Sequence, residues 1–411
     1  MRTAIKTLFV LAAAGSFASV AAAQSAVSWL ATGEGDFAPT ELAAPLGHKA
    51  TSLSQDAVAV SWAVPAEKAL DLVETPFVAT SKEYWIDVTG ADLARGIELP
   101  THGPGALLRI NPVAGEKLAT PLDPMALEVT TPAKALLEGN AAFATLVDSA
   151  QLEAAGAPFA DGTIAGRLRS ELGAGTFGVQ LAGLAEDGRF VVHVLDHGSP
   201  LELAVRTDRA NYLDGDTLVV RSSLAGTKAR GAVEGFVVSP AGRAWPLVAE
   251  RSRDGEFHFS LELDGAEAPA PGLWEAHLSY RGEVDGLRVR RYGKVAFAVA
   301  MPAGRLDGNA ALTETPGQLA VTLGVETAAD GRFEVRGVLF GSDAAGKLQP
   351  IAVGHSAAWL GAGAGSLELR FDQALVDASG LGAPFEVRDL RLLDQGNLAL
   401  LQRQAHGLRI E

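Results

Sequence analysis

Apolar and polar residues alternate with a period of two along most of the chain. The segment 271–304 shows this best, because large apolar side chains occupy every second position of 274–280, 287–289 and 295–299. A period of two is typical of a strand that buries one face. The segment therefore predicts three consecutive antiparallel strands, with a turn at 282–286 between the first two.

The same pattern divides the chain into three β-rich regions. Residues 24–200 predict a β-rich N-terminal domain with one or two short helices, one of them capped by Asn140 and running to Leu152. Residues 201–302 hold about seven strand-like runs at turn spacings typical of an immunoglobulin-like sandwich. Residues 303–411 repeat that style, with a short helix expected at Gln373–Ala378. The predicted fold class is all-β, with tandem Ig-like β-sandwiches after the N-terminal domain.

The first 23 residues resemble an export signal. Arg2 and Lys6 precede an apolar stretch of small residues from Thr7 to Val20, and an Ala-x-Ala site precedes a cleavage point between Ala23 and Gln24. This layout is typical of a secretory signal peptide, and the alternative is an uncleaved membrane anchor. The chain has no cysteine, which excludes disulfides and a lipid anchor attached through a cysteine. With no second apolar run long enough to cross a membrane, we expect a soluble protein in the periplasm or outside the cell.

Composition argues against nucleic acid as a partner. The net charge is −15, and such a field repels nucleic acid and anionic membranes. The basic cluster Arg288, Arg290 and Arg291 is too short to reverse this field. We interpret it as the solvated face of a strand.

Several chemical motifs fail on their context. The G-x-G-x-x-G spacing at 173–178 lies between two strands, and the G-x-x-x-x-G-K at 341–347 lacks the Ser or Thr that holds magnesium. His193, Asp196 and His197 could form a metal site if the chain turns at Asp196. The alternative is a pair of histidines that are solvated or hydrogen-bonded, because positions four apart on a strand lie about 13 Å from each other.

Trp85 is the most suggestive single residue. The alternation in Glu83–Val88 places it on the polar face with Glu83 and Asp87. An outward tryptophan between carboxylates could stack on a sugar or on a peptide side chain. The alternative is a tryptophan covered by a neighbouring helix or domain.

Longer stretches resemble known domains. The run Asn211–Leu218 resembles the Tyr-x-x-Gly-Asp signature of bacterial Ig-like and macroglobulin-like domains. The segments Ser81–Pro112, PGLWEAH, GKLQPIAVGHSAAWL and DLRLLDQGN are similar to a secreted gammaproteobacterial family of unknown function. The resemblance implies an N-terminal β-rich domain followed by two Ig-like domains, and it supplies no catalytic residues.

We therefore interpret the chain as an exported, non-catalytic binding or interaction protein. The expected partners are a glycan, an envelope component or another protein, and no cofactor is expected. Two alternatives stay open: a secreted hydrolase with its site in the N-terminal domain, and an envelope-assembly factor that adds a strand to its clients. The sequence leaves the oligomeric state unknown.

Overall fold

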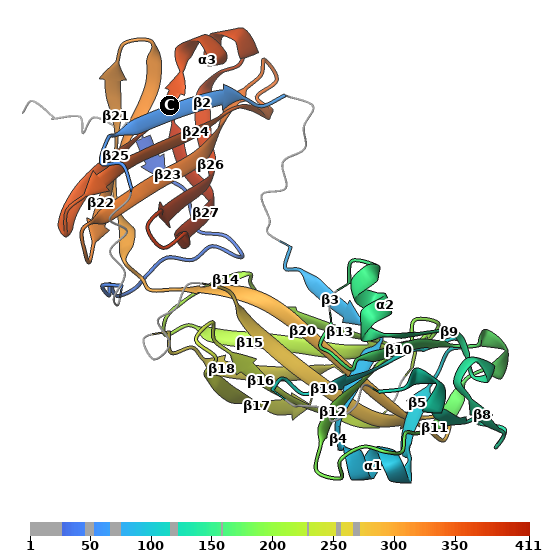
Figure 1. Ribbon diagram of the computed structural model, residues 1–411. Coiled ribbons are helices and arrows are strands. Elements are labelled where there is room, and N and C mark those ends of the chain that lie inside the picture. Colours follow the sequence, from blue (N-terminus) through green and yellow to red (C-terminus); the bar gives the residue numbers. More distant parts are fainter. Residues whose placement is uncertain are drawn as a thin grey trace, which may run out of the picture.

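The computed structural model describes residues 27–45, 53–65, 75–115, 122–157, 159–227, 230–251, 256–265 and 272–411. The fold is all-β, as predicted, and its sheets are almost entirely antiparallel. Within the described residues, buried apolar side chains gather in three large cores, one for each body visible along the chain (Figure 1). We call these bodies the first domain, the middle sandwich and the last sandwich.

The first domain packs two sheets around its core. Its helices are short: α1 (Gly90–Arg95), α2 (Ser149–Ala154) and the 3₁₀ turns η1 (Pro124–Ala126), η2 (Gly139–Ala141) and η3 (Ser170–Leu172). One sheet holds β4 (Glu83–Thr89), β12 (Arg189–Leu195), β6 (Leu107–Pro112), β10 (Ile164–Leu168) and β9 (Phe143–Asp148). The other holds β5 (Ile97–Thr101), β11 (Gly175–Gln180), β7 (Glu128–Thr130) and β8 (Leu136–Glu138).

The helix expected from Asn140 to Leu152 is wrong in its bounds. Asn140 lies in η2, residues 143–148 form β9, and helix α2 starts only at Ser149. The reason is a stronger cap further on: Asp148 accepts a hydrogen bond from the Gln151 N–H, and the Gln151 side chain accepts one from the Asp148 N–H. The sequence also predicts a short helix at 65–72, with Pro65 at its first position, and all of it except Pro65 lies outside the described residues.

The middle sandwich shares a continuous sheet with the first domain. Its strands are β3 (Val78–Ser81), β13 (Glu202–Thr207), β15 (Thr217–Ala225), β18 (Phe257–Glu262), β17 (Ala244–Arg251), β16 (Arg230–Val238), β19 (Trp274–Val284) and β20 (Leu287–Ala300), in that order, with β14 (Asn211–Leu213) beside β20. Strand β20 meets β4 where Tyr292 lies opposite Glu83. The outer faces of β4, β20, β19 and β16 thus form one surface.

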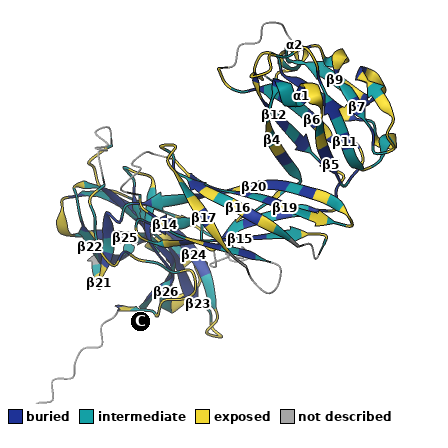
Figure 2. Cartoon of the chain, turned by 90° about the horizontal axis from the view of Figure 1, so that it is seen from below, coloured by how far each residue is buried: buried dark blue, intermediate teal, exposed yellow. Residues whose placement is uncertain are grey.

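The segment 271–304 forms fewer and longer strands than predicted. The predicted second and third strands are one strand of 14 residues, β20, because the apolar positions on both sides of Gly293 keep the same parity. The turn is only Asp285–Gly286, both with positive φ, and Val284 pairs with Leu287 across it. This is the two-residue hairpin that Asp-Gly favours. Buried residues alternate with half-buried or exposed ones along most of both strands, and 291–293 of β20 are all buried (Figure 2).

The last sandwich contains two segments from the start of the chain. Its larger sheet has the order β1 (Val27–Trp29), β27 (Ala399–Ile410), β26 (Gly382–Asp394), β23 (Gly331–Ser342), β24 (Leu348–Leu360) and β2 (Val58–Ala63). Its smaller sheet holds β21 (Gly304–Thr315), β22 (Gln318–Thr327) and β25 (Gly363–Asp372), and helix α3 covers Gln373–Ser379, close to the expected range. Figure 1 shows the blue β2 across this body, apart from the cyan β3 that enters the middle sandwich.

This placement differs from the domain limits expected from the sequence. Residues 27–29 and 58–63, expected within a domain covering 24–200, pair with β27 and β24. The physical reason is that β27 and β24 would otherwise be the edges of a large sheet, and exposed edges favour further pairing. The limits near residues 200 and 303 stay predictions.

Candidate functional site

Trp85 lies on the outer face of β4, as its alternation predicted. Its neighbour Tyr84 is buried in the core and donates a hydrogen bond to the Pro100 carbonyl oxygen over 3.0 Å. Trp85 itself is 40% exposed, and Glu83 and Asp87 lie on the same face of the strand. The structure therefore presents the indole to solvent, with one carboxylate two residues before it and one two residues after it.

Trp85 belongs to a row of rings that crosses the shared sheet. We define the aromatic row as His193 of β12, Trp85 of β4, Tyr292 of β20, His277 of β19 and Phe236 of β16. The centroids of successive rings are 5.2, 4.2, 5.9 and 4.8 Å apart. Phe236, at the far end, is 41% exposed. The row forms because neighbouring strands lie about 4.8 Å apart, so that outward side chains of adjacent strands come into contact.

Charged groups line the row and are paired with one another. Glu83 accepts a hydrogen bond from His193 over 2.8 Å, and this bond holds the pKa of Glu83 below its usual value. Glu275 interacts with Lys294 over 2.7 Å and with His277 over 3.1 Å, and the bond from Lys294 is the main reason for its lowered pKa. Burial raises the pKa of Tyr292 to about 12. At neutral pH, Glu83 and Glu275 beside the row are therefore ionised, and each contacts a histidine or lysine side chain. The Tyr292 phenol is neutral.

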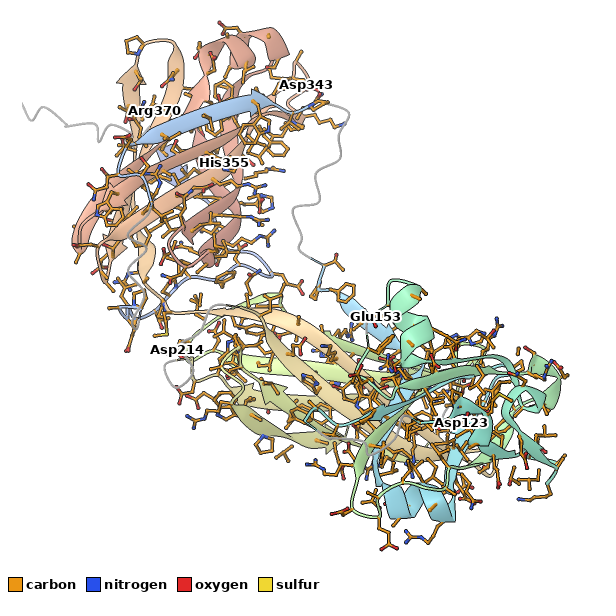
Figure 3. All side chains as sticks on the ribbon, viewed as in Figure 1. Asp123, Glu153, Asp214, Asp343, His355 and Arg370 are labelled. Atoms are coloured by element: carbon orange, nitrogen blue, oxygen red, sulfur yellow. The ribbon has the colours of Figure 1, made fainter. Side chains whose placement is uncertain are left out.

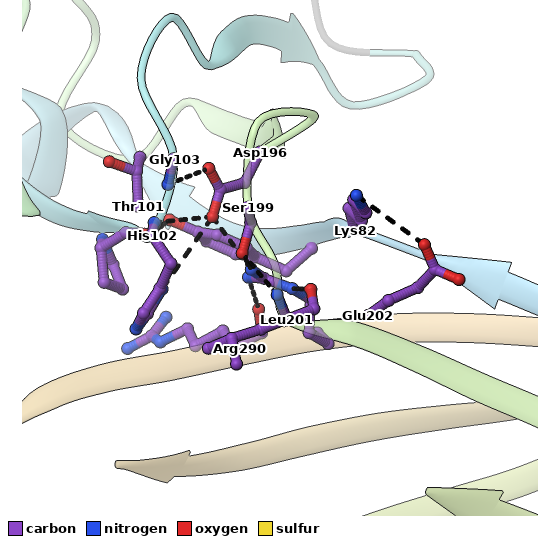
Figure 4. A network of polar contacts seen from close by, with 12 residues as sticks. Lys82, Thr101, His102, Gly103, Asp196, Ser199, Leu201, Glu202 and Arg290 are labelled. Atoms are coloured by element: carbon purple, nitrogen blue, oxygen red, sulfur yellow. Dashed lines mark hydrogen bonds and ion pairs between the residues drawn. The ribbon is translucent and has the colours of Figure 1, made fainter. Parts of the chain in front are cut away.

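The junction between the first domain and the middle sandwich lies beneath this surface. Arg291 of β20 and Asp196, just after β12, form an ion pair at 2.9 Å, and both side chains are fully buried. Asp196 also accepts hydrogen bonds from the N–H groups of His102 and Gly103, at 2.7 and 3.0 Å. Figure 4 shows this network around Asp196 and Ser199. The network fixes the strand that carries Tyr292 against the domain that carries Trp85.

Comparison with known proteins agrees with this architecture. Two family models match the chain: the N-terminal domain of a domain-of-unknown-function family, DUF4785, at residues 49–196, and the C-terminal domain of the same family at residues 304–411. Together they cover more than half of the chain. The chain belongs to the DUF4785 family.

A solved structure has the same fold. The crystal structure of a DUF4785 family protein from Legionella pneumophila is 23% identical, covers 90% of this chain and 98% of its own, and superposes with a TM-score of 0.72. The C-terminal globular domain of an oligosaccharyltransferase from Pyrococcus abyssi is 10% identical over 74% of this chain and 76% of its own. Its TM-score of 0.14 is too low to support any argument. No curated protein matches the chain. The comparisons thus support the resemblance to a family of unknown function that the sequence indicated. The Legionella protein is a gammaproteobacterial neighbour in structure.

The DUF4785 fold separates the three residues considered for a metal site. His193 points into the aromatic row, where it contacts Glu83. Asp196 is turned inward, where its carboxylate accepts hydrogen bonds from Arg291 and two backbone N–H groups, and His197 is exposed in the turn that follows. Within the described part of the chain, no group of three or more His, Cys, Asp or Glu side chains could hold a metal ion.

The structure corrects the interpretation of the basic cluster. Arg288 and Arg290 lie on the outer face of β20, but Arg291 is one residue further and faces inward, where it is only 1% exposed. The alternation itself contained this signal, because Arg291 has the parity of the buried residues Val289 and Val295. Sequence analysis also missed Tyr292, His277 and Phe236 as neighbours of Trp85, since cross-strand contacts require the register. The expected cleavage point at Ala23 and Gln24 lies outside the described residues.

Acidification is expected to destabilise the DUF4785 protein through His277. Burial lowers the pKa of His277, so the folded state holds this ring neutral while the unfolded chain protonates it near its ordinary value of about 6.5. Stability should therefore fall as the pH decreases through about 6.5 toward the lowered pKa, by at most about 1.4 kcal/mol per pH unit. Urea unfolding of the parent and of His277→Gln at pH 7.5 and 5.5 measures this difference. An equal loss of stability in both proteins would contradict the attribution of this pH dependence to His277.

Proposed function

We propose that this DUF4785 protein is an exported, non-catalytic binding protein whose aromatic row is its ligand-binding surface. The observation that carries the proposal is the 40% exposure of Trp85 within a row of rings spanning five strands. Exposed aromatic side chains on a rigid sheet favour contacts with the apolar face of a sugar or with peptide side chains. The proposal includes removal of residues 1–23, a place in the periplasm or outside the cell, and Ig-like topology for the last two domains.

The charges of the row favour binding over hydrolysis. Glycoside hydrolysis needs one carboxyl group that stays protonated as the acid, with a raised pKa. Glu83 and Glu275 have lowered pKa values because each is hydrogen-bonded to a cationic or imidazole group.

Among the described residues, no helix is long and apolar enough to cross a membrane.

The test is a thermal-shift screen with soluble peptidoglycan fragments and common polysaccharides. A ligand at a hundred times its dissociation constant should stabilise the parent by about 2.7 kcal/mol. Trp85→Ser should lose the shift, and Trp62→Ser should keep it, because Trp62 is a tryptophan of similar exposure on the last sandwich. A shift that survives in Trp85→Ser, or a parent that responds to none of these probes, would contradict the proposal.

A further inference from the structure

The last sandwich carries an unusual strand at one edge. In β2 the larger side chains Val58, Val60 and Trp62 point outward and are 47–48% exposed, while Ala59 and Ser61 point inward. The inner face carries these small residues where β25 lies against the strand, and the Asp372 N–H donates to the Ser61 hydroxyl over 3.0 Å. The strand therefore presents an apolar row to solvent. Figure 3 shows β2 beside the labelled His355.

This apolar row lies next to His355, Arg336 and Arg391, which follow one another across the same face. The sheet register places Val60 opposite His355, His355 opposite Arg336, and Arg336 opposite Arg391. Trp62 stacks on His355 with ring centroids 4.8 Å apart. Successive positions are about 4.8 Å apart, so Arg336 lies about 10 Å from Val60.

Arg336 is a cation of this face without a carboxylate partner among the described residues. Its neighbours are paired: His355 with Glu334 at 2.6 Å, Arg388 with Glu386 at 2.6 Å, and Arg391 with Asp389 at 3.0 Å. Among the described residues Arg336 makes no ion pair, and its Nε is buried without a hydrogen-bond acceptor. The face therefore combines one free guanidinium with an apolar row two strands away.

We propose that this face binds an acidic, extended segment of a partner protein, with a carboxylate on Arg336 and an apolar side chain on Val60 and Trp62. The spacing fits a carboxylate and an apolar residue two to four positions apart in an extended peptide. An anionic lipid surface fits less well, because attraction to such a surface takes several basic residues, and Arg388 and Arg391 are neutralised by Glu386 and Asp389.

A random dodecapeptide display library tests the proposal on the purified protein. Peptides enriched on the parent should carry Asp or Glu within two to four residues of an aromatic or branched apolar residue. For the best peptide, fluorescence anisotropy should show a dissociation constant raised about tenfold or more in Arg336→Met and in Trp62→Ser, and stronger binding at low salt. Arg281→Met, which removes an exposed arginine from the middle sandwich, should bind like the parent.

Three outcomes would overturn the proposal. The first is enrichment without acidic residues, or a best peptide whose affinity is unchanged in Arg336→Met. The second is co-sedimentation with phosphatidylglycerol vesicles that is lost in Arg336→Met, which would assign the face to a lipid surface. The third is a dimer in sedimentation that is lost in Trp62→Ser, which would assign it to a second copy. Thermal unfolding near that of the parent should show that both variants fold. The aromatic row is a different surface, so either proposal can fail without the other.

Discussion

A fragment consisting of residues 304–411 alone is expected to be largely unfolded, although it spans the whole C-terminal family match. The last sandwich needs Val27, Trp29 and Phe37, which contact its core, and β2, which pairs along β24. Burial of three such side chains is worth about 5–9 kcal/mol, similar to the whole stability of many domains. Arg332 would also lose the carbonyl acceptors of Ser54 and Asp56, both at 2.7 Å.

A permuted chain is the matched control for this fragment. Val27 lies opposite Ile410 in an antiparallel pair, so a short glycine-containing turn can join Glu411 to Val27. The order 304–411, turn, 27–65 should restore a folded domain. Near-ultraviolet circular dichroism and urea unfolding measure both proteins. A cooperative transition in the 304–411 fragment alone would show that the N-terminal segment is dispensable.

Asp196→Asn is expected to destabilise the protein by about 3–5 kcal/mol. The substitution leaves the Arg291 guanidinium buried without a counter-charge, although its Nε still donates to the Leu201 carbonyl oxygen over 3.0 Å and its Nη2 to Ser199 over 2.7 Å. An isolated buried charge is costly because it has lost its hydration. Urea unfolding followed by the fluorescence of the tryptophans should show the loss in the transition of the first domain and middle sandwich.

Two further variants separate the buried charge from a general effect of mutation. Arg288 and Glu98 form an exposed ion pair across the same junction, so Glu98→Gln should cost no more than about 1 kcal/mol. The double variant Asp196→Asn/Arg291→Met should lose less than the sum of the two single changes, because it leaves no unpaired charge. Additive losses, or a loss in Glu98→Gln as large as in Asp196→Asn, would argue against the ion pair as the cause.

The candidate site shows which features a local sequence pattern predicts and which it does not. Alternation in 83–88 predicted that Trp85 points outward with Glu83 and Asp87, since the direction of a side chain in a strand depends only on parity. The same rule predicts that Arg291 points inward when it is applied to each residue of the basic cluster separately. Treating Arg288, Arg290 and Arg291 as one solvated group missed this. The contact of Trp85 with Tyr292 was beyond prediction, because two residues 207 positions apart meet only through the register of β4 and β20.

The sequence by itself determined the all-β class, the alternation along each strand and the presence of a turn within 282–286, because these depend on residues close together in the chain. Only the tertiary structure decided that β1 and β2 complete the last sandwich, that β20 joins β4 in one sheet, and that Asp196 meets Arg291. Each of these is a pairing between distant segments. Many segments of similar alternation can pair with one another, and the choice depends on which combination buries most apolar surface and leaves fewest polar groups unpaired.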